Sequence, residues 1–167
     1  MFERTSEITN FVTIEMESGD KITIELYPQH APISVENFKN LVSESFYDGI
    51  IFHRVIAGFM IQGGDPKGIG IGGSDKTIKG EFRANGVNNT LSHKRGVVSM
   101  ARTQVPDSAS SQFFICHADA TFLDGNYAAF GEVVEGIETV DKIAGVKTDF
   151  RDKPLFDQRM KEVYFVK

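Results

Sequence analysis

One short segment of the sequence combines the residue types from which a reaction site could be built. Between Phe52 and Asp65, a cation at Arg54, a histidine at His53 and an amide at Gln62 interrupt a run of large apolar residues. An arginine stays charged at any working pH and offers N–H donors in a rigid plane. Such donors lower a barrier when they face the atom on which charge builds up in a transition state. The alternative is that Arg54 lies on a solvated face, with its aliphatic stem packed on its neighbours.

Strand geometry predicts which of these side chains lie together. Successive side chains of a strand point to opposite faces of the sheet. Counted from Phe52, this alternation predicts that Phe52, Arg54 and Ile56 share one face. His53 and Val55 then share the opposite face. Arg54 is therefore expected on a face that also carries apolar neighbours.

A glycine-rich motif follows this segment. Residues 68–73 match the pattern G-x-G-x-x-G. In a dinucleotide site this pattern stands between a strand and a helix, because the helix N-terminus holds the pyrophosphate. Here Asp65-Pro66-Lys67 precedes it, and residues 74–77 follow without a helical pattern of apolar residues. We therefore interpret the motif as a flexible loop and not as a dinucleotide site.

Metal and nucleophilic chemistry have no local signature in the chain. The four histidines, at positions 30, 53, 93 and 117, lack a paired spacing such as H-x-x-x-H. No G-x-S-x-G elbow is present, although a catalytic triad is defined by geometry and not by chain position. Cys116 is the single cysteine and lies in the apolar run 113–116, which favours a packed thiol over a reactive one. We therefore expect no metal, no cofactor and no intramolecular disulfide.

Three regions of the chain show the spacing of apolar residues that is expected of a hairpin or a helix. Apolar residues alternate with polar ones on both sides of a short glycine-containing turn, which predicts an antiparallel hairpin over residues 11–26. Helical spacing of apolar residues behind Pro32 predicts a helix over residues 32–44. A second helix is predicted over residues 137–144, with Gly145 at its C-terminal end.

The remaining elements complete a mainly β chain. Further strands are predicted at residues 51–56, 58–62, 96–100, 112–116, 127–134 and 163–166, and residues 63–94 are predicted to be mostly loop. About eight strands and two helices favour a barrel or a sandwich. A barrel leaves no exposed sheet edge, and each helix could cover one open end. The length of 167 residues predicts one domain, residues 1–167, with residues 1–7 as a short tail.

Charge and hydropathy exclude several classes of partner. Lys and Arg total 18 against 23 Asp and Glu, which gives a net charge of -5 and no basic patch for nucleic acid or an anionic membrane. No stretch of 18 apolar residues is present, and the N-terminus has no apolar signal segment. These features predict a cytoplasmic protein. The absence of a coiled-coil pattern predicts a monomer.

Three ordered blocks resemble the signature of the cyclophilins, which are peptidyl-prolyl cis-trans isomerases. The first is residues 52–65, the second combines 96–101 with 111–115, and the third combines 122–125 with 130–133. The resemblance runs from about Phe11 to the C-terminus. It implies a closed eight-stranded antiparallel β-barrel capped by two α-helices. It also implies a substrate groove on the outer wall of the barrel, with Arg54 pointing outward into it.

The same resemblance implies roles for individual residues. Arg54 matches the catalytic residue of the family. The walls of the proline pocket match Phe59, Met60, Phe114 and Leu123. The other positions that match the substrate-binding groove or flank it are His53, Ile56, Gln62, Ala101, Arg102, Thr103, Gln112, Phe122 and Tyr127. Arg102 would contribute backbone groups, and His53 would shape the site beside Arg54.

Three departures from the best-known eukaryotic members concern ligand choice. Phe122 stands where those members carry a tryptophan, and Tyr127 stands where they carry a histidine. Residues 102–104 replace an Asn-Ala sequence. The chain holds 14 phenylalanines and no tryptophan, and phenylalanine lacks the hydrogen-bond donor of an indole. We therefore predict weak binding of cyclosporin-type cyclic peptides, with turnover of proline peptides retained.

The implied reaction fits the residues. The peptide C–N bond resists rotation by about 18–20 kcal/mol. In the twisted transition state the nitrogen regains its lone pair, and a fixed cation with N–H donors binds that state more strongly than the planar one. The expected partners are proline-containing peptides and folding proteins. The alternatives are a non-catalytic peptide-binding module or chaperone that uses the same groove, and an unrelated hydrolase on a β-barrel.

Overall fold

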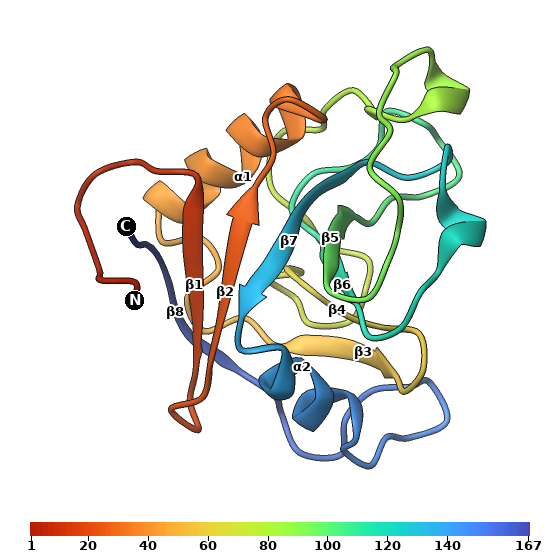
Figure 1. Ribbon diagram of the computed structural model, residues 1–167. Helices are drawn as coiled ribbons and strands as arrows, with labels where there is room; N and C mark the ends of the chain where they lie inside the picture. The colour runs from red at the N-terminus through yellow and green to blue at the C-terminus, as the bar shows by residue number, and fades with distance from the viewer.

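The computed structural model describes all 167 residues (Figure 1). Eight strands, two α-helices and two short 3-10 turns follow one another along the chain. In chain order they are β1 Phe11–Met16, β2 Lys21–Leu26, α1 Pro32–Ser43, β3 Phe52–Ile56, β4 Met60–Gly63, η1 Arg83–Asn85, β5 Val97–Met100, β6 Phe113–Cys116, η2 Thr121–Leu123, β7 Ala129–Glu135, α2 Ile137–Ala144 and β8 Met160–Phe165. The predicted hairpin, the two helices and the count of eight strands are confirmed.

The eight strands form one curled antiparallel sheet in the order β3-β4-β6-β5-β7-β2-β1-β8. Its outermost strands, β3 and β8, do not pair with each other as strands. One isolated bridge, Ile51 to Arg159, links the segments that lead into them. Figure 1 shows α1 near the upper end of the strands and α2 near the lower end, so the helices lie at different ends of the sheet.

Aromatic rings fill the space inside the curled sheet. The core is a cluster of 31 buried residues. Phe38 of α1 lies at its centre, with ring centroids 5.2 Å from Tyr47, 5.5 Å from Phe113 and 5.3 Å from Phe130. The hydroxyl of Tyr47 donates a 2.8 Å hydrogen bond to the carbonyl of Ser111, so the buried phenol is satisfied. Six of the 14 phenylalanines belong to this core cluster, so core packing uses part of the phenylalanine excess of the sequence.

The strict alternation predicted for β3 is wrong at one place. Phe52 pairs with Gly63 and Arg54 pairs with Gln62, so β3 carries one extra residue, His53, opposite β4. Such a bulge bends the strand and re-aims the side chains on either side of it. Phe52 consequently lies in the core together with Val55, whereas Arg54 is exposed. The bulge therefore separates the arginine from the phenylalanine with which it was expected to share a face.

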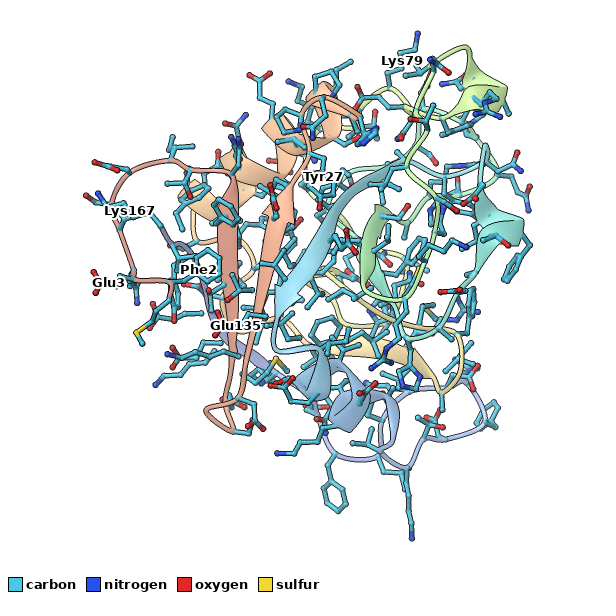
Figure 2. All side chains as sticks on the ribbon, in the orientation of Figure 1. Phe2, Glu3, Tyr27, Lys79, Glu135 and Lys167 are labelled. Atoms are coloured by element: carbon cyan, nitrogen blue, oxygen red, sulfur yellow. The ribbon has the colours of Figure 1, made fainter.

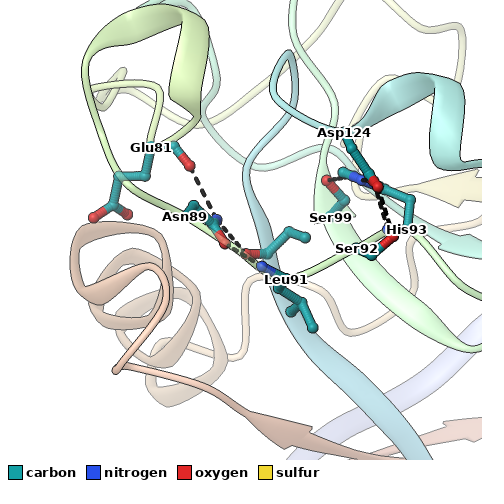
Figure 3. Close-up of polar contacts among 8 residues, drawn as sticks. Glu81, Asn89, Leu91, Ser92, His93, Ser99 and Asp124 are labelled. Atoms are coloured by element: carbon teal, nitrogen blue, oxygen red, sulfur yellow. Dashed lines mark hydrogen bonds and ion pairs between the residues drawn. The ribbon is translucent and has the colours of Figure 1, made fainter.

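The long loop over residues 63–94 is ordered by buried polar contacts. It contains η1, and its Ile78 bridges to Ala109. The carboxylate of Glu81 accepts hydrogen bonds from the backbone N–H groups of Ile33 and Ser34 at 3.1 and 2.6 Å, and so caps the N-terminus of α1. The side chain of Asn89 donates to the carbonyl of Glu81 (Figure 3). These contacts fix the loop to the first helix.

The two chain ends lie beside each other. Figure 2 shows Glu3 and Lys167 close together. The N–H of Glu3 donates to the carbonyl of Lys167 at 2.9 Å, and the N–H of Lys167 donates to the carbonyl of Glu3 at 2.9 Å. The segment predicted as a tail is therefore partly paired. β8 begins at Met160, three residues before the predicted strand. No helix of the structure is both long enough and apolar enough to span a membrane.

Candidate functional site

The outward faces of β4 and β6 carry a second, smaller apolar cluster. It consists of Met60, Phe114, Cys116 and Ala120, all buried. Met60 pairs with Cys116 and Gln62 pairs with Phe114, so period-2 alternation places these side chains on the same outer face. Ile56 and Phe59 are among the partly buried residues that pack against the cluster. This apolar floor lies outside the main core of the curled sheet and could accommodate an apolar ring.

A pocket of about 160 Å³ opens on this floor. Its 9 lining residues are Arg54, Phe59, Met60, Gln62, Ala101, Arg102, Phe114, Leu123 and Tyr127. All of them are among the positions to which the resemblance to the cyclophilins gave a role. The remaining candidate residues do not line this pocket. Thr103 and Gln112 line an adjoining pocket of about 380 Å³.

Arg54 stands at the edge of the pocket with few hydrogen bonds of its own. Its side chain is exposed and donates one long hydrogen bond, 3.4 Å, to Oε1 of Gln62. It forms no ion pair. Because an arginine keeps its charge and has five N–H donors, most of the donors of Arg54 are free to face a bound molecule.

A chain of amide groups fixes the acceptor that faces Arg54. Gln112 donates from Nε2 to the carbonyl of Gly72 at 2.8 Å, and Gln62 donates from Nε2 to Oε1 of Gln112 at 2.9 Å. A carbonyl can only accept, so Gln112 must present its NH2 group to Gly72 and its oxygen to Gln62. Gln62 in turn must present its oxygen to Arg54. The backbone of the glycine-rich loop thus sets the orientation of both amides.

Asp65 holds that loop in place. Its carboxylate accepts from the backbone N–H groups of Lys67 at 2.8 Å, Ile69 at 3.1 Å and Gly70 at 2.7 Å. Burial alone would raise the pKa of Asp65, but these backbone donors outweigh burial and lower it. A side chain at Gly72 would clash with the carboxylate of Asp65. The glycine-rich motif therefore wraps a protein carboxylate, and it is not followed by a helix.

Arg102 lines the same pocket as Arg54, but its guanidinium has several partners within the protein. Its guanidinium donates to the carbonyl of Asn126 at 3.0 and 2.7 Å and to the carbonyl of Thr103 at 2.9 Å. It also lies over the rings of Phe82 and Tyr127, 4.6 and 4.8 Å from their centroids. This side chain braces the wall of the pocket. Sequence reasoning assigned Arg102 only a backbone role and missed the brace.

Aromatic contacts set the walls of the pocket. The ring of Phe59 lies 5.6 Å from that of Phe122, which is 71% exposed at the rim. The ring of Tyr127 meets Phe114 edge-on at 5.9 Å. Leu123 belongs to η2, immediately after Phe122. Phe122 therefore flanks the pocket through Phe59.

His53 does not line the pocket. The residue is 6% exposed, and its Nδ1 has no hydrogen-bond partner. Burial lowers the pKa of His53, an effect that the nearby Asp65 carboxylate partly opposes. The extra residue of the β3 bulge thus faces the glycine-rich loop, where Gly70 approaches its ring.

A serine, a histidine and an aspartate form a triad-like arrangement behind the pocket (Figure 3). His93 contacts Asp124 through Nδ1 at 2.8 Å and Ser99 through Nε2 at 2.8 Å. Ser99 is 0% exposed, and the ring of His93 stacks on Phe114. Burial lowers the pKa of His93, and a substrate has no path to the serine oxygen. This arrangement contradicts the hydrolase alternative, because the nucleophile is enclosed.

No other chemical centre is assembled. No group of three or more histidine, cysteine, aspartate or glutamate side chains is placed to hold a metal ion. Burial raises the pKa of the Cys116 thiol to about 12, which favours the packed-thiol interpretation over a reactive one. The signal that could have revealed Asp124 was its place in the third motif, directly after Leu123. Asp65 likewise stands at the end of the first motif, whereas His93 lies outside all three motifs.

Comparison with known proteins decides the family. The model of the family described as "Cyclophilin type peptidyl-prolyl cis-trans isomerase/CLD" matches residues 11–165. The chain belongs to the cyclophilin family. The recognition based on three sequence motifs is thereby confirmed, and the chain is a peptidyl-prolyl cis-trans isomerase of the cyclophilin type.

Curated relatives and solved structures agree with this family. The Schizosaccharomyces pombe peptidyl-prolyl cis-trans isomerase ppi1 is 45% identical over 144 residues, which cover 85% of this chain and 91% of the relative. Peptidyl-prolyl cis-trans isomerase B of Bacillus subtilis is 47% identical over 123 residues, 74% of this chain and 82% of that one.

A cyclophilin-type isomerase of Cryptosporidium parvum has a crystal structure that is 31% identical and superposes with a TM-score of 0.86, over 95% of this chain and 97% of that one. A second structure of that cyclophilin was determined in the presence of the dipeptide Ala-Pro, with 32% identity, a TM-score of 0.85 and coverage of 93% and 98%.

Proposed function

We propose that this cyclophilin accelerates rotation about X-Pro peptide bonds in its 160 Å³ outer pocket, with Arg54 as the catalytic residue. The observation that carries the proposal is the combination of a largely unpaired guanidinium with a dry apolar floor in one pocket. Proline peptides and folding proteins are the substrates. The cyclophilin structure determined in the presence of Ala-Pro supports this substrate class.

The pocket holds one side of the rotating bond. The pyrrolidine ring is apolar and fits against Phe59, Met60 and Phe114, which exclude water. With the ring fixed, the carbonyl side of the X-Pro bond is the part that turns. No bond is broken and no proton is transferred, so the reaction needs no nucleophile.

Arg54 acts on the imide nitrogen. In the planar ground state the nitrogen lone pair is delocalised into the carbonyl and accepts a hydrogen bond poorly. At the twisted state the lone pair returns to nitrogen, and an N–H donor of Arg54 then gains a partner. Raising a rate from about 0.01 to 10–1,000 per second requires roughly 4–7 kcal/mol. One charge-assisted contact in a partly dry cleft, together with fixed positioning, supplies a term of that size.

A protease-coupled assay on an X-Pro peptide tests the proposal. We expect clear acceleration by the wild-type chain and loss of nearly all of it in Arg54→Ala. Arg151→Ala is a matched control, because Arg151 is exposed and lies outside both pockets. Full activity in Arg54→Ala would rule out this mechanism. Binding of proline peptides without acceleration would favour the peptide-binding module instead.

Four finer predictions accompany this function. We infer that the curled sheet closes into a barrel, which the Ile51–Arg159 bridge and the 2.9 Å bond from the N–H of Phe52 to the carbonyl of Gln158 support. Weak cyclosporin binding is supported by Phe122, whose exposed ring offers no N–H donor. A monomeric state and a cytoplasmic location stay predictions from the sequence.

A further inference from the structure

His117 holds the turn that carries one wall of the proline pocket. The turn joins β3 to β4, and the N–H of Phe59 closes it on the carbonyl of Ile56 at 3.0 Å. Nδ1 of His117 accepts a 2.8 Å hydrogen bond from the N–H of Gly58, and the backbone N–H of His117 donates to the carbonyl of Phe59 at 2.9 Å. His117, one residue beyond the end of β6, thus forms hydrogen bonds with two successive residues of the turn, Gly58 and Phe59.

These bonds define the protonation of the His117 ring. A ring nitrogen that accepts from a backbone N–H carries no proton, so the single proton of the neutral ring lies on Nε2. Nε2 faces Oδ1 of Asp141 at 3.0 Å. Arg95 binds that carboxylate with both terminal nitrogens, at 2.7 and 2.8 Å, and also donates to the carbonyl of His117 at 2.8 Å. Asp141 and Arg95 therefore orient the ring that grips the turn.

The turn depends on the hydrogen bonds with His117 because it is short and exposed. Gly58 is exposed and has a φ of +80°, a conformation that glycine adopts without strain, and no atom lies within 4 Å of the place where a side chain would begin. Phe59, the next residue, lines the pocket and packs on Phe122. A shift of Gly58 therefore moves the aromatic wall of the pocket, while Arg54 stays on β3.

We propose that His117 is a positioning residue of the proline pocket, and that a second proton, on Nδ1, releases the Gly58–Phe59 turn and weakens proline-peptide binding in acid. The inference rests on the proposed function only for the identity of the ligand. The protonated ring has two N–H groups and no acceptor, so Nδ1 and the N–H of Gly58 become two donors facing each other. Histidine is the side chain that changes charge between about pH 5 and 8.

The charged groups around the ring come from three elements. Asp141 faces it from α2, and Arg95 faces it from the segment before β5. Asp119, from the segment after β6, accepts from the N–H of Arg95. The turn over residues 57–59 carries no titratable side chain. The ring is 22% exposed, so a proton from solvent can reach it.

Two substitutions separate the effect of the hydrogen-bond acceptor of His117 from the effect of the volume of its side chain. In His117→Asn, a short amide oxygen takes the place of Nδ1 and can accept from Gly58 without titrating. In His117→Leu, the bulk remains and the acceptor is lost. The dissociation constant of an Ala-Pro peptide, measured by NMR titration from pH 8 to pH 5 well below the unfolding temperature, reports the state of the pocket whether or not turnover is observed. Exchange spectroscopy on the same samples gives the rate at saturation.

For wild type we expect binding that weakens by about threefold to tenfold in acid, the size of one lost hydrogen bond. His117→Leu should bind weakly at every pH, and His117→Asn should bind tightly at every pH, with the saturated rate nearly unchanged in both. Nitrogen shifts of the ring should report the proton on Nε2 at pH 8. Equal binding by His117→Leu and wild type, a pH dependence that survives in His117→Asn, or a proton on Nδ1 at pH 8 would overturn the inference. Tight, pH-dependent binding without turnover would instead overturn the isomerase mechanism alone.

Discussion

Two arginines line the same pocket, and they differ in almost every other respect. Arg102 directs its guanidinium to two backbone carbonyls and two aromatic rings. Arg54 has one long hydrogen bond to an amide oxygen and no ion pair. Both side chains carry the same charge, so charge alone does not explain why Arg54, and not Arg102, is the proposed catalytic residue.

The two arginines differ in how many of their N–H donors remain free to bind a substrate. Three of the five N–H donors of Arg102 already bond to backbone carbonyls in the free protein, and its guanidinium lies over two rings. The donors of Arg54 are largely met by solvent, which a bound peptide displaces. An interaction that forms only when the substrate twists lowers the barrier, whereas one already made in the free protein stabilises the fold. Arg54 is thus suited to the reaction and Arg102 to the frame around it.

The largest effect on stability is expected for Arg102→Ala. Removing the side chain leaves two carbonyls without their donors and two rings without a cation, which should lower the free energy of unfolding by about 2 kcal/mol. Chemical denaturation measures the change. Arg151→Ala is a control, since Arg151 lies over a single exposed ring, Phe150. A stability for Arg102→Ala equal to that of the control would show that the brace is dispensable.

The next largest effect is expected for Gln62→Glu, a substitution that gives Arg54 a bonded partner in the free protein, as Arg102 already has. Gln62→Glu places a carboxylate beside the guanidinium of Arg54, 3.4 Å away in the native geometry. Arg54 is then paired in the free protein, like Arg102, and we expect kcat to fall by about tenfold, roughly 1.4 kcal/mol. Gln62→Leu removes the partner without adding charge and should cost less. The comparison between the arginines fails if the glutamate variant is the faster of the two.

The smallest effect concerns the histidines behind the pocket. Burial lowers the pKa values of both His53 and His93 from 6.5. A histidine with a lowered pKa binds fewer protons in the folded chain than in the unfolded chain, so stability is complete above pH 6.5 and falls as the pH drops from 6.5 toward the folded value. Thermal unfolding scans from pH 8 to pH 5 check this sign. Higher stability at pH 5 would contradict the buried neutral state of both rings.

Local pattern was enough for the secondary-structure elements, whereas the candidate pocket residues came from a family resemblance. Alternation, helical spacing and turn residues predicted the hairpin, both helices and eight strands, because each signal lies within one short segment. Seven of the nine lining residues were named because they lie inside three motifs that resemble a known family, and Arg102 and Tyr127 were named because they lie beside those motifs. The bulge at His53 was not predicted, since a single extra residue leaves no mark in the sequence of β3 alone.

The features of the site that were not predicted depend on contacts between residues that lie far apart in the sequence. The orientation of Gln62 depends on the carbonyl of Gly72, through Gln112, and no spacing rule connects these three positions. The same holds for Arg102 over Phe82 and for Asp124 behind His93. The predicted helix end at Gly145 is confirmed, and the φ of -89° of this residue is ordinary helical backbone.

Exchange NMR on an Ala-Pro peptide tests the role of Arg54 most directly, because one experiment yields both the saturated rate and the dissociation constant. If Arg54 engages the nitrogen only in the twisted state, Arg54→Ala lowers kcat by about 10²- to 10³-fold while the dissociation constant changes by less than about threefold. If kcat is unchanged and the dissociation constant alone rises, Arg54 is a binding residue and the account of catalysis given for this pocket is wrong.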